Sequence, residues 1–230
     1  MRIAVVIPTL NEAGNIGKVI AAIPPELNAV TIVADNGSTD NTVAEATAAG
    51  AMALHQPQRG YGSACLKALS FLANLPHPKQ PDVVVFIDGD CSDDPTEIPL
   101  LLQPIVSGKA ELVIGSRTRG NAQPGSMTLP QRFGNWLATR LLYRFYGVKF
   151  TDLGPFRAIT WQTLQHLQMQ DPNFGWTVEM QLKAAKARIC CTEVPVSYKR
   201  RASGKSKISG TVKGTILAGY IILRTLFRYR

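Results

Sequence analysis

The chain has 230 residues and a net charge of +9, and 45% of its residues are hydrophobic and 18% charged. This apolar content excludes wholesale disorder, and the length indicates one or two domains. No run reaches the roughly 18 apolar residues of a membrane span, and the four cysteines show no Cys-x-x-Cys spacing, so we expect a reduced, globular, cytoplasmic protein without a disulfide framework or zinc cage.

The first half of the chain alternates short apolar runs, rich in Val and Ile, with helical patterns. We expect strands at residues 3–7, 30–34, 51–54, 83–87 and 112–114. We expect helices at residues 16–23, 42–49, 64–72 and 97–106. Apolar strands alternating with helices predict the α/β class, with a mainly parallel sheet covered on both faces. Polar residues follow four of these strands, at the sheet edge where such folds bind ligands.

The second half of the chain is organised differently. A Gly- and Pro-rich loop is predicted at residues 118–129, followed by two helices, a strand and a terminal helix at 129–146, 177–187, 189–198 and 211–228. We expect Trp136 and Trp176 to be core aromatics. The chain divides into a main domain over residues 1–210 and a C-terminal amphipathic helix over residues 211–230.

The charge is unevenly distributed along the chain. Residues 1–115 carry a formal charge of −6, whereas residues 116–230 carry +15. From Lys199 onward there are nine basic residues and no acidic residue. Such asymmetry indicates a polyanionic partner: nucleic acid, an anionic membrane surface or a phosphate-bearing substrate. A solvated basic face is the alternative.

Asp88 and Asp90 follow the predicted strand at residues 83–87. Two carboxylates at this spacing can point the same way, and their hard oxygen atoms suit Mg²⁺ or Mn²⁺. An EF-hand is excluded because Asp93 stands where that loop needs glycine and Pro99 where it needs glutamate. Capping of the next helix explains Asp93 and Asp94 but not the earlier pair.

Two glycine motifs fail as nucleotide fingerprints. Gly60-x-Gly62 has Cys65 in place of the third glycine of a dinucleotide-binding turn, and the segment at 204–206 lacks the first glycine of a P-loop. Gly60 and Gly62 still allow a ligand to approach the backbone closely, although an ordinary turn before a helix explains them equally well.

Four polar motifs follow one another along the chain: Pro-Thr-Leu-Asn-Glu at 8–12, Asp-Asn-Gly-Ser-Thr-Asp at 35–40, Asp-Gly-Asp at 88–90 and Arg-Ala-Ser-Gly-Lys-Ser-Lys at 201–207. In this order they resemble the motifs of glycosyltransferase family 2, above all its dolichyl- or polyprenyl-phosphate sugar transferase branch. The resemblance covers residues 3–210 and implies a GT-A fold, which is Rossmann-like. It also implies an enzyme that uses a nucleotide-sugar donor with a divalent metal.

The resemblance implies a role for particular residues. Nucleotide-binding residues would be Pro8, Asn11, Glu12, Asp35, Gly60, Gly62 and Asp88. Asp88 and Asp90 would hold Mg²⁺ or Mn²⁺ on the donor diphosphate. Phosphate-binding residues would be Arg117, Arg132, Arg157, Arg201, Lys205 and Lys207. Asn36 replaces the usual second acid of its motif, and Ser92 replaces a glutamine typical of mannose-transferring relatives, which loosens an assignment to mannose.

The acceptor can be a lipid phosphate or a sugar hydroxyl. A hydroxyl needs a general base, for which Asp152 and Glu179 are the candidates. Asp152 can also orient the acceptor or its cations, or simply form a turn, and Glu179 can form a solvent-facing ion pair with Lys183. The surplus of cations over carboxylates favours a phosphate acceptor, which is largely dianionic near neutral pH.

We therefore predict an inverting, metal-dependent enzyme. It would transfer a hexose from a UDP- or GDP-linked sugar to a polyprenyl or dolichyl phosphate. The rivals are a soluble family 2 transferase acting on a glycan hydroxyl and, remotely, a non-catalytic nucleic-acid or membrane-binding module. Apolar and basic stripes on the C-terminal helix predict peripheral contact with the anionic cytoplasmic face of a membrane. We expect no nucleic-acid partner.

Overall fold

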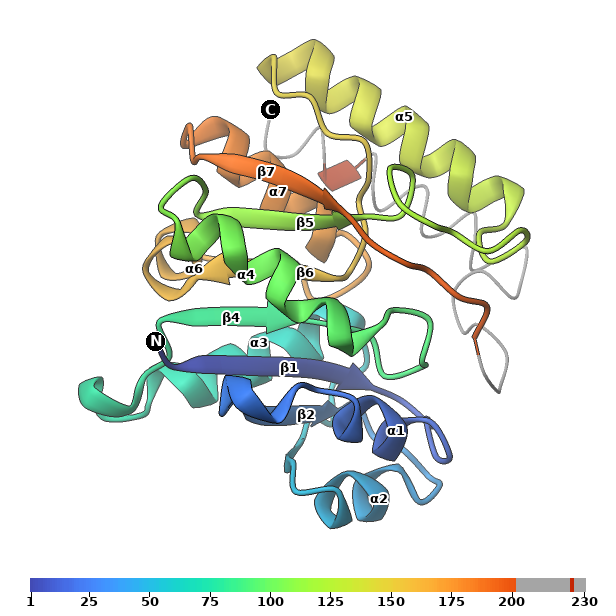
Figure 1. Cartoon of the computed structure of the whole chain (residues 1–230), viewed down its shortest axis with the longest axis vertical. Coiled ribbons are helices and arrows are strands. Elements are labelled where there is room, and N and C mark those ends of the chain that lie inside the picture. Colours follow the sequence, from blue (N-terminus) through green and yellow to red (C-terminus); the bar gives the residue numbers. More distant parts are fainter. Residues whose placement is uncertain (202–223, 226–230) are drawn as a thin grey trace.

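The computed structural model describes residues 1–201 and 224–225. These residues form a seven-stranded sheet in the order β3-β2-β1-β4-β6-β5-β7 (Figure 1). The strands are β1 (Ile3–Thr9), β2 (Val30–Asp35), β3 (Met52–His55), β4 (Val83–Phe86), β5 (Leu112–Ser116), β6 (Arg157–Thr160) and β7 (Cys191–Pro195). Neighbouring strands are parallel except that β6 runs antiparallel to both β4 and β5. The predicted α/β sheet, mainly parallel, is confirmed.

Helices cover both faces of the sheet. They are α1 (Ile16–Ala21), α2 (Thr42–Ala48), α3 (Tyr61–Ala73), α4 (Ile98–Val106), α5 (Leu129–Tyr146), α6 (Trp161–Leu167) and α7 (Trp176–Lys186). Short 3₁₀ helices lie at Pro25–Leu27, His77–Lys79 and Pro95–Glu97. The helices α1, α2 and α4 cover one face, α3, α6 and α7 cover the other, and α5 packs beside α7 (Figure 1).

The sheet has an apolar core on each side because alternate side chains of a strand point to opposite faces. In β1, Ala4 and Val6 pack towards α3, whereas Val5 and Ile7 pack towards α1 and α4. Every residue of β1 is buried. This double burial explains why the central strands are nearly unbroken apolar runs in the sequence.

Most predicted elements are present with ends shifted by a few residues, and α5 has the predicted bounds. Thr128 and Gln131 form a capping box at its start, and Gly147 ends it with a φ of 70°. The sequence analysis missed β6 and α6. The strand β6 begins with a charged residue, Arg157, and Thr160 caps α6 directly after the strand, so no turn residues separate the two elements.

The two tryptophans differ in their surroundings. Trp176 is 1% exposed and packs edge-on against Phe86, which confirms its predicted place in the core. The prediction for Trp136 is wrong, because this side chain is 54% exposed on α5. It occupies a position on the outer face of the helix, where no neighbouring element of the described chain covers it.

The described residues include no helix that is both long and apolar enough to cross a membrane. The expected helix at residues 211–228 and the basic loop at 202–209 lie outside the described residues, apart from Arg224 and Thr225, which are helical. The predicted division at residue 210 therefore stays a prediction.

Candidate active site

A cavity of about 390 Å³ opens where β1, β2, β4 and β5 end. Seven of the predicted site residues line it: Pro8, Glu12, Gly60, Asp88, Asp90, Arg117 and Arg201. They come from segments far apart in the sequence, which parallel strands bring to one edge of the sheet. The start of α5 and the loop before α7 complete the wall through Gln131 and Phe174.

The carboxylate pair lines the cavity. Asp88 follows β4, and its Oδ1 atom is buried without a hydrogen-bond partner among residues 1–201 and 224–225. Asp90 accepts a hydrogen bond of 2.9 Å from the Ser92 backbone N–H. Burial and the neighbouring Asp90 charge raise the pKa of Asp88 to about 7. The residue between them is glycine, because a Cβ there would lie 2.9 Å from Thr9 Cγ2.

These two carboxylates fit a divalent metal. A buried carboxylate oxygen without a partner is costly unless a cation neutralises it, and oxygen ligands suit Mg²⁺ and Mn²⁺. Within the described residues, no group of three or more His, Cys, Asp or Glu side chains is arranged to hold a metal. Asp88 and Asp90 would therefore hold the ion, leaving positions for water and substrate phosphate.

Asp93 was predicted to cap a helix, and the structure assigns that role to its neighbour. Asp94 accepts a hydrogen bond from the Thr96 backbone N–H, whereas Asp93 is 3% exposed. Both carboxyl oxygens of Asp93 lack a hydrogen-bond partner in the described part of the chain. Burial, together with Asp88, raises the pKa of Asp93 well above its usual range. Sequence reasoning missed this residue because a run of acids gives no signal of which one is buried.

Arg117 stands on the wall of the cavity that is formed after β5. Asp152 is fully buried and accepts three hydrogen bonds from Arg117: 2.7 Å from the backbone N–H, 2.9 Å from Nε and 2.6 Å from Nη2. The guanidinium also lies 4.9 Å from the centroid of the Tyr198 ring. Burial disfavours the charge, but the Asp152 carboxylate outweighs it and raises the pKa of Arg117.

This geometry gives Asp152 a positioning role. Its carboxylate does not line the cavity, and its backbone N–H is held by Glu193 Oε1 at 3.1 Å. A bidentate contact fixes the plane of a guanidinium. Asp152 therefore holds the guanidinium of Arg117, which lines the cavity, and orienting a cation was one of the alternatives predicted for it.

Arg201 pairs with two of the acidic residues that line the cavity. It forms ion pairs of 2.8 Å with Glu12 Oε1 and 2.9 Å with Asp90 Oδ2. Upstream of Arg201, Lys199 pairs with Asp94 at 2.8 Å, and Ser197 bonds Glu97 through its backbone N–H at 2.8 Å. The segment after β7 is thus tied to the residues that follow β4.

Two predicted nucleotide-binding residues shape the loops around the cavity. Asp35 accepts hydrogen bonds from the backbone N–H groups of Gly37 and Ser38 at 3.1 Å each. Asn11 accepts one from Thr39 N–H at 2.8 Å. The cavity lining includes neither Asp35 nor Asn11, and instead includes Asn36. Asp35 therefore closes the turn that presents Asn36 to the cavity.

Asn36, which replaces a family acid, connects two loops. Its Nδ2 donates to the backbone oxygens of Gln56 and Gln58 at 3.1 and 2.6 Å, and its Oδ1 accepts from Gly60 N–H at 2.7 Å. An aspartate could not make the two donor contacts. The signal was present in the sequence as a departure from the family pattern, but its partners lie 20 to 24 residues away.

Gly60 and Gly62 both allow a close approach, but the approaching group belongs to the same chain. A Cβ on Gly62 would lie 1.9 Å from the Asp171 backbone oxygen, and one on Gly60 2.1 Å from that of Pro172. Gly60 also has a φ of 135° and lines the cavity. The glycines therefore let the loop before α7 pack against the start of α3.

Two other predicted residues, Glu179 and Arg132, lie away from the cavity lining. Glu179 is fully buried, accepts hydrogen bonds from the backbone N–H groups of Gln170 and Asp171, and pairs with Lys183 at 2.8 Å. Glu179 was a candidate general base or one half of a solvent-facing ion pair; the ion pair with Lys183 is present but buried, and the carboxylate holds the loop before α7. Arg132 is exposed on α5. Lys205 and Lys207 lie outside the described residues.

Arg157 also needs correction. It is fully buried and donates to the backbone oxygens of Gly154, Leu153 and Thr177. Burial lowers its pKa to about 10, which still leaves the guanidinium charged near neutral pH. The predicted phosphate contact is wrong for this position, because the guanidinium connects backbone carbonyls inside the domain.

A mainly parallel sheet with one antiparallel strand, a carboxylate pair after β4 and a cationic wall facing it together define a GT-A glycosyltransferase. The chain belongs to glycosyl transferase family 2, whose model matches residues 4–166. The predicted family, fold and enzyme class are therefore confirmed.

Several relatives match most of the chain. An uncharacterized glycosyltransferase of Mycobacterium tuberculosis is 35% identical and is matched over 94% of both chains. The glycosyltransferase AglJ of Haloferax volcanii is 33% identical over 98% of this chain and 71% of its own. An undecaprenyl-phosphate mannosyltransferase of Micrococcus luteus is 27% identical over 93% and 90%.

Solved structures share the fold. Glucosyl-3-phosphoglycerate synthase of Mycobacterium tuberculosis, in complex with Mn²⁺, UDP and phosphoglyceric acid, superposes with a TM-score of 0.75 at 23% identity. The match covers 99% of this chain and 78% of that one. A complex of the same enzyme with Mn²⁺, UDP-glucose and phosphoglyceric acid gives a TM-score of 0.75 at 24% identity, covering 99% and 79%.

Proposed function

We propose that the protein transfers a hexose from a nucleoside diphosphate sugar to a polyprenyl or dolichyl phosphate, with inversion at the sugar carbon. One observation carries the proposal: Asp152 and Glu179, the two candidate bases, are fully buried and bonded within the protein, whereas three arginines, Arg59, Arg117 and Arg201, line the cavity. The similarity to the undecaprenyl-phosphate mannosyltransferase of Micrococcus luteus supports a lipid phosphate acceptor.

The absence of a suitable base from the cavity lining favours an acceptor that is already an anion. The acidic residues lining the described cavity are Glu12, Asp88 and Asp90. Glu12 and Asp90 both contact Arg201, and Asp88 is the proposed metal ligand. A phosphate monoester has a second pKa of about 6 and is largely dianionic near neutral pH, so it can attack the sugar without a protein base.

The cations serve the two phosphate groups that must meet. A donor diphosphate and an acceptor phosphate repel one another, and fixed positive charges reduce that repulsion. Arg117 is held rigidly by Asp152, so it is oriented before the substrates bind. Arg201 has partners on the opposite wall. We assign Arg117 to the phosphates at the reacting end and Arg201 to the donor diphosphate.

We propose that Asp88 and Asp90 hold Mg²⁺ or Mn²⁺ on the donor diphosphate. A bound divalent cation stabilises the negative charge that develops on a leaving diphosphate. The buried Oδ1 atom of Asp88, which lacks a hydrogen-bond partner among the described residues, supports this assignment. Glucosyl-3-phosphoglycerate synthase, which shares the fold, was crystallised in complex with Mn²⁺ and UDP, and this favours the same chemistry here.

The test is a transfer assay that separates the acceptors. The purified chain is incubated with Mg²⁺ or Mn²⁺ and radiolabelled UDP-glucose, UDP-N-acetylglucosamine or GDP-mannose. Each donor is offered a polyprenyl phosphate, phosphoglyceric acid or a glycan. We expect the label to enter the organic phase only with the polyprenyl phosphate. Label in phosphoglycerate or glycan products, with none in lipid, would refute the acceptor assignment while leaving the enzyme class intact.

The pH dependence sharpens this test. If the lipid phosphate supplies the nucleophile, the rate should rise as that phosphate loses its second proton, and Glu179→Gln should leave the shape of the profile unchanged. A glycan-hydroxyl enzyme would instead lose the titrating limb on Asp152→Asn or Glu179→Gln. The same profile, recorded with the unsubstituted chain, is the control.

A further inference from the structure

The outer face of α5 is apolar and exposed. Leu129, Phe133, Trp136 and Tyr143 are 78%, 62%, 54% and 57% exposed. Their spacing places them on one side of the helix at about 100° per residue. The rings of Phe133 and Trp136 contact each other in a tilted arrangement, with centroids 5.8 Å apart. Large side chains gathered in this way on a surface mark an interaction site more often than isolated exposed ones do.

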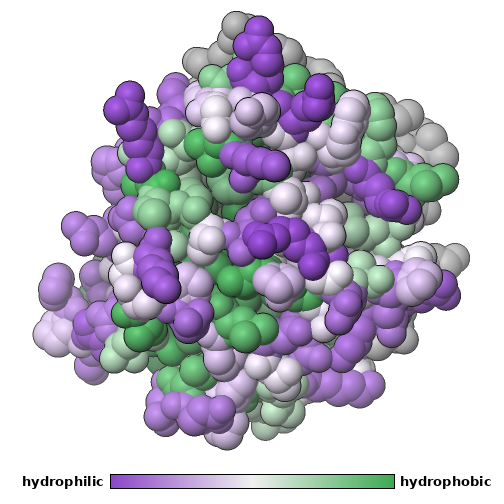
Figure 2. All heavy atoms as spheres, turned by 45° about the horizontal axis from the view of Figure 1, so that its top comes forward, coloured by the Kyte–Doolittle hydropathy of each residue, from purple (hydrophilic) through white to green (hydrophobic). Residues whose placement is uncertain are grey.

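Basic residues accompany the apolar ones. Arg140 and Arg144 are exposed, and they fall within the same arc of about 120° on α5. The α5 surface is defined here as Leu129, Phe133, Trp136, Arg140, Tyr143 and Arg144. In Figure 2, where this end of the molecule is turned forward, hydrophilic and hydrophobic side chains alternate over it. From residue 112 to residue 151 the sequence contains no acid.

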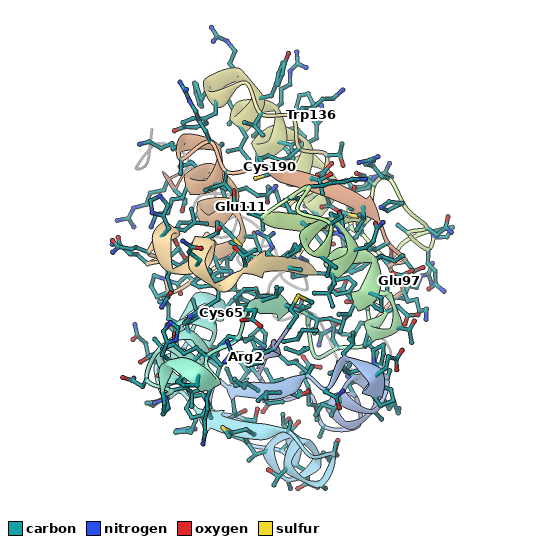
Figure 3. All side chains as sticks on the ribbon, turned by 60° about the vertical axis from the view of Figure 1, so that its left-hand side comes forward. Arg2, Cys65, Glu97, Glu111, Trp136 and Cys190 are labelled. Carbon is teal, nitrogen blue, oxygen red and sulfur yellow. The ribbon has the colours of Figure 1, made fainter. Side chains whose placement is uncertain are left out.

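The α5 surface lies next to the mouth of the cavity. The helix begins at Leu129, and Gln131 in its first turn lines the cavity. Its opposite side is anchored by Ala138 and Leu142 in the core shared with α7. Figure 3 shows Trp136 on the outer side of α5. A partner bound to this surface would therefore sit on the helix whose first turn lines the cavity.

We propose that the α5 surface docks the protein on an anionic lipid membrane. Trp and Tyr favour the interface between headgroups and acyl chains, and arginine at the same depth pairs with anionic headgroups. Charge decides against a second copy of this chain as the occupant. A two-fold contact would place Arg140 and Arg144 of each copy against a face that carries no acid. The apolar side chains also favour lipid over nucleic acid.

The proposed function explains why docking would be useful to the protein, but docking itself does not depend on that function. A membrane-embedded acceptor presents its phosphate at the headgroup layer, and docking through α5 holds the cavity mouth at that layer. Docking itself is measured without donor, acceptor or metal. Failure of the docking experiment and failure of the transfer assay are therefore separate results.

Tryptophan fluorescence gives a local test, because one of the three tryptophans is exposed. Trp136 is 54% exposed, whereas Trp161 and Trp176 are 7% and 1% exposed. The full chain is titrated with phosphatidylcholine vesicles containing about one third phosphatidylglycerol. We expect a blue shift and protection from acrylamide quenching, both lost in Trp136→Phe although this variant still pellets. Unchanged Trp136 emission from protein that pellets would overturn the proposal, since another part of the chain would then be binding.

Sedimentation tests the energetics with a matched control. Removing two apolar anchors, Phe133→Ser with Trp136→Ser, should weaken binding about tenfold or more. The control replaces two exposed apolar residues of α4, Leu100→Ser with Val106→Ser, and should bind as the unsubstituted chain does. Arg140→Gln with Arg144→Gln should weaken binding to anionic vesicles but not to pure phosphatidylcholine.

Each alternative occupant has its own outcome. Equal losses in the α4 and α5 variants would refute a specific surface. A blue shift that grows with protein concentration in the absence of vesicles would assign the surface to a second copy. An equal response of Trp136 to poly(U) would assign it to nucleic acid. Transfer to a short, water-soluble isoprenyl phosphate should be the same for the α5 variants and the unsubstituted chain.

Discussion

The acidic and basic residues that line the cavity come mostly from opposite halves of the chain. Glu12, Asp88 and Asp90 follow β1 and β4 and form the acidic wall, whereas Arg117 and Arg201 follow β5 and β7 and form the basic wall. Arg59, which follows β3, is a lining arginine from the first half. The sequence shows the same division, with −6 in residues 1–115 and +15 in residues 116–230. The fold therefore places the charge difference between the two halves of the chain across one cavity. The acidic wall suits a metal cation, and the basic wall suits phosphate.

Removing one carboxylate of the acidic wall should abolish nearly all transfer activity. Asp90→Asn should lower the transfer rate about 1,000-fold or more, because the metal loses a ligand and the leaving diphosphate loses its counter-charge. Chelation of the metal in the unsubstituted protein should have the same effect, reversible by Mn²⁺. The measurement is transfer of radiolabel under excess metal.

The matched control for this variant is Asp94→Asn. Asp94 lies four residues away, outside the cavity lining, and asparagine is as good a helix cap as aspartate. Asp94→Asn also loses the ion pair with the exposed Lys199, but such surface pairs contribute only about 0–1 kcal/mol. It should therefore transfer sugar at close to the rate of the unsubstituted protein. Full activity of Asp90→Asn, or of chelated protein, would show that the acidic wall holds no catalytic metal.

Removing the carboxylate that holds Arg117 in the basic wall should lower the transfer rate without abolishing transfer. Asp152→Asn leaves Arg117 in place but without its buried counter-charge, and breaking a buried pair costs about 3 kcal/mol or more of the free energy of unfolding. We expect transfer to fall about 100-fold, since the guanidinium loses its fixed orientation.

The pH–rate profile separates positioning from base catalysis at Asp152. A positioning residue changes the height of the profile but not its shape, so the residual activity of Asp152→Asn should follow the same pH dependence. Asp152→Glu, which keeps the charge, should unfold less readily than Asp152→Asn. A profile that loses its titrating limb would make Asp152 the base.

The sequence predicted the acidic wall better than the basic wall, for a physical reason. Asp88 and Asp90 follow an apolar strand directly, so their place at the sheet edge depends only on local pattern. The roles of Asp152 and Arg157 depend on contacts that no local pattern encodes. Asp152 meets Arg117 across 35 residues, and Arg157 is buried because a strand that the pattern did not predict carries it inside.

Asn36, which stands where the family pattern has an acid, bonds residues that are distant in the sequence. Asn36→Asp restores the family acid but places a carboxylate against the backbone oxygens of Gln56 and Gln58. We expect a loss of about 1–3 kcal/mol in the free energy of unfolding, which lowers the melting temperature by several degrees. Thermal unfolding measures it, with Asn41→Asp as the control at an exposed position.

The smallest expected effect is a gain in stability at Asp88, at a position where transfer activity is lost. The carboxyl group of Asp88 is partly buried, and one of its oxygens lacks a partner in the described chain. In the metal-free protein this charge opposes folding, so Asp88→Asn should be more stable at about pH 8, by about 1 kcal/mol or 2–4 °C in melting temperature. The same variant should be inactive, because it removes a proposed metal ligand.

The pH dependence of this gain follows from the direction of the shift. The pKa of Asp88 is raised from 3.8 to about 7 in the folded protein. The folded state therefore binds the proton more tightly, and the unsubstituted protein gains stability as pH falls through about 7 towards 4. The advantage of Asp88→Asn should be present above pH 7 and vanish as the pH approaches 4. Mn²⁺ should reverse the order at about pH 8, since it stabilises only the protein that binds it. A variant less stable than the unsubstituted protein at every pH without metal would show that Asp88 supports the fold instead.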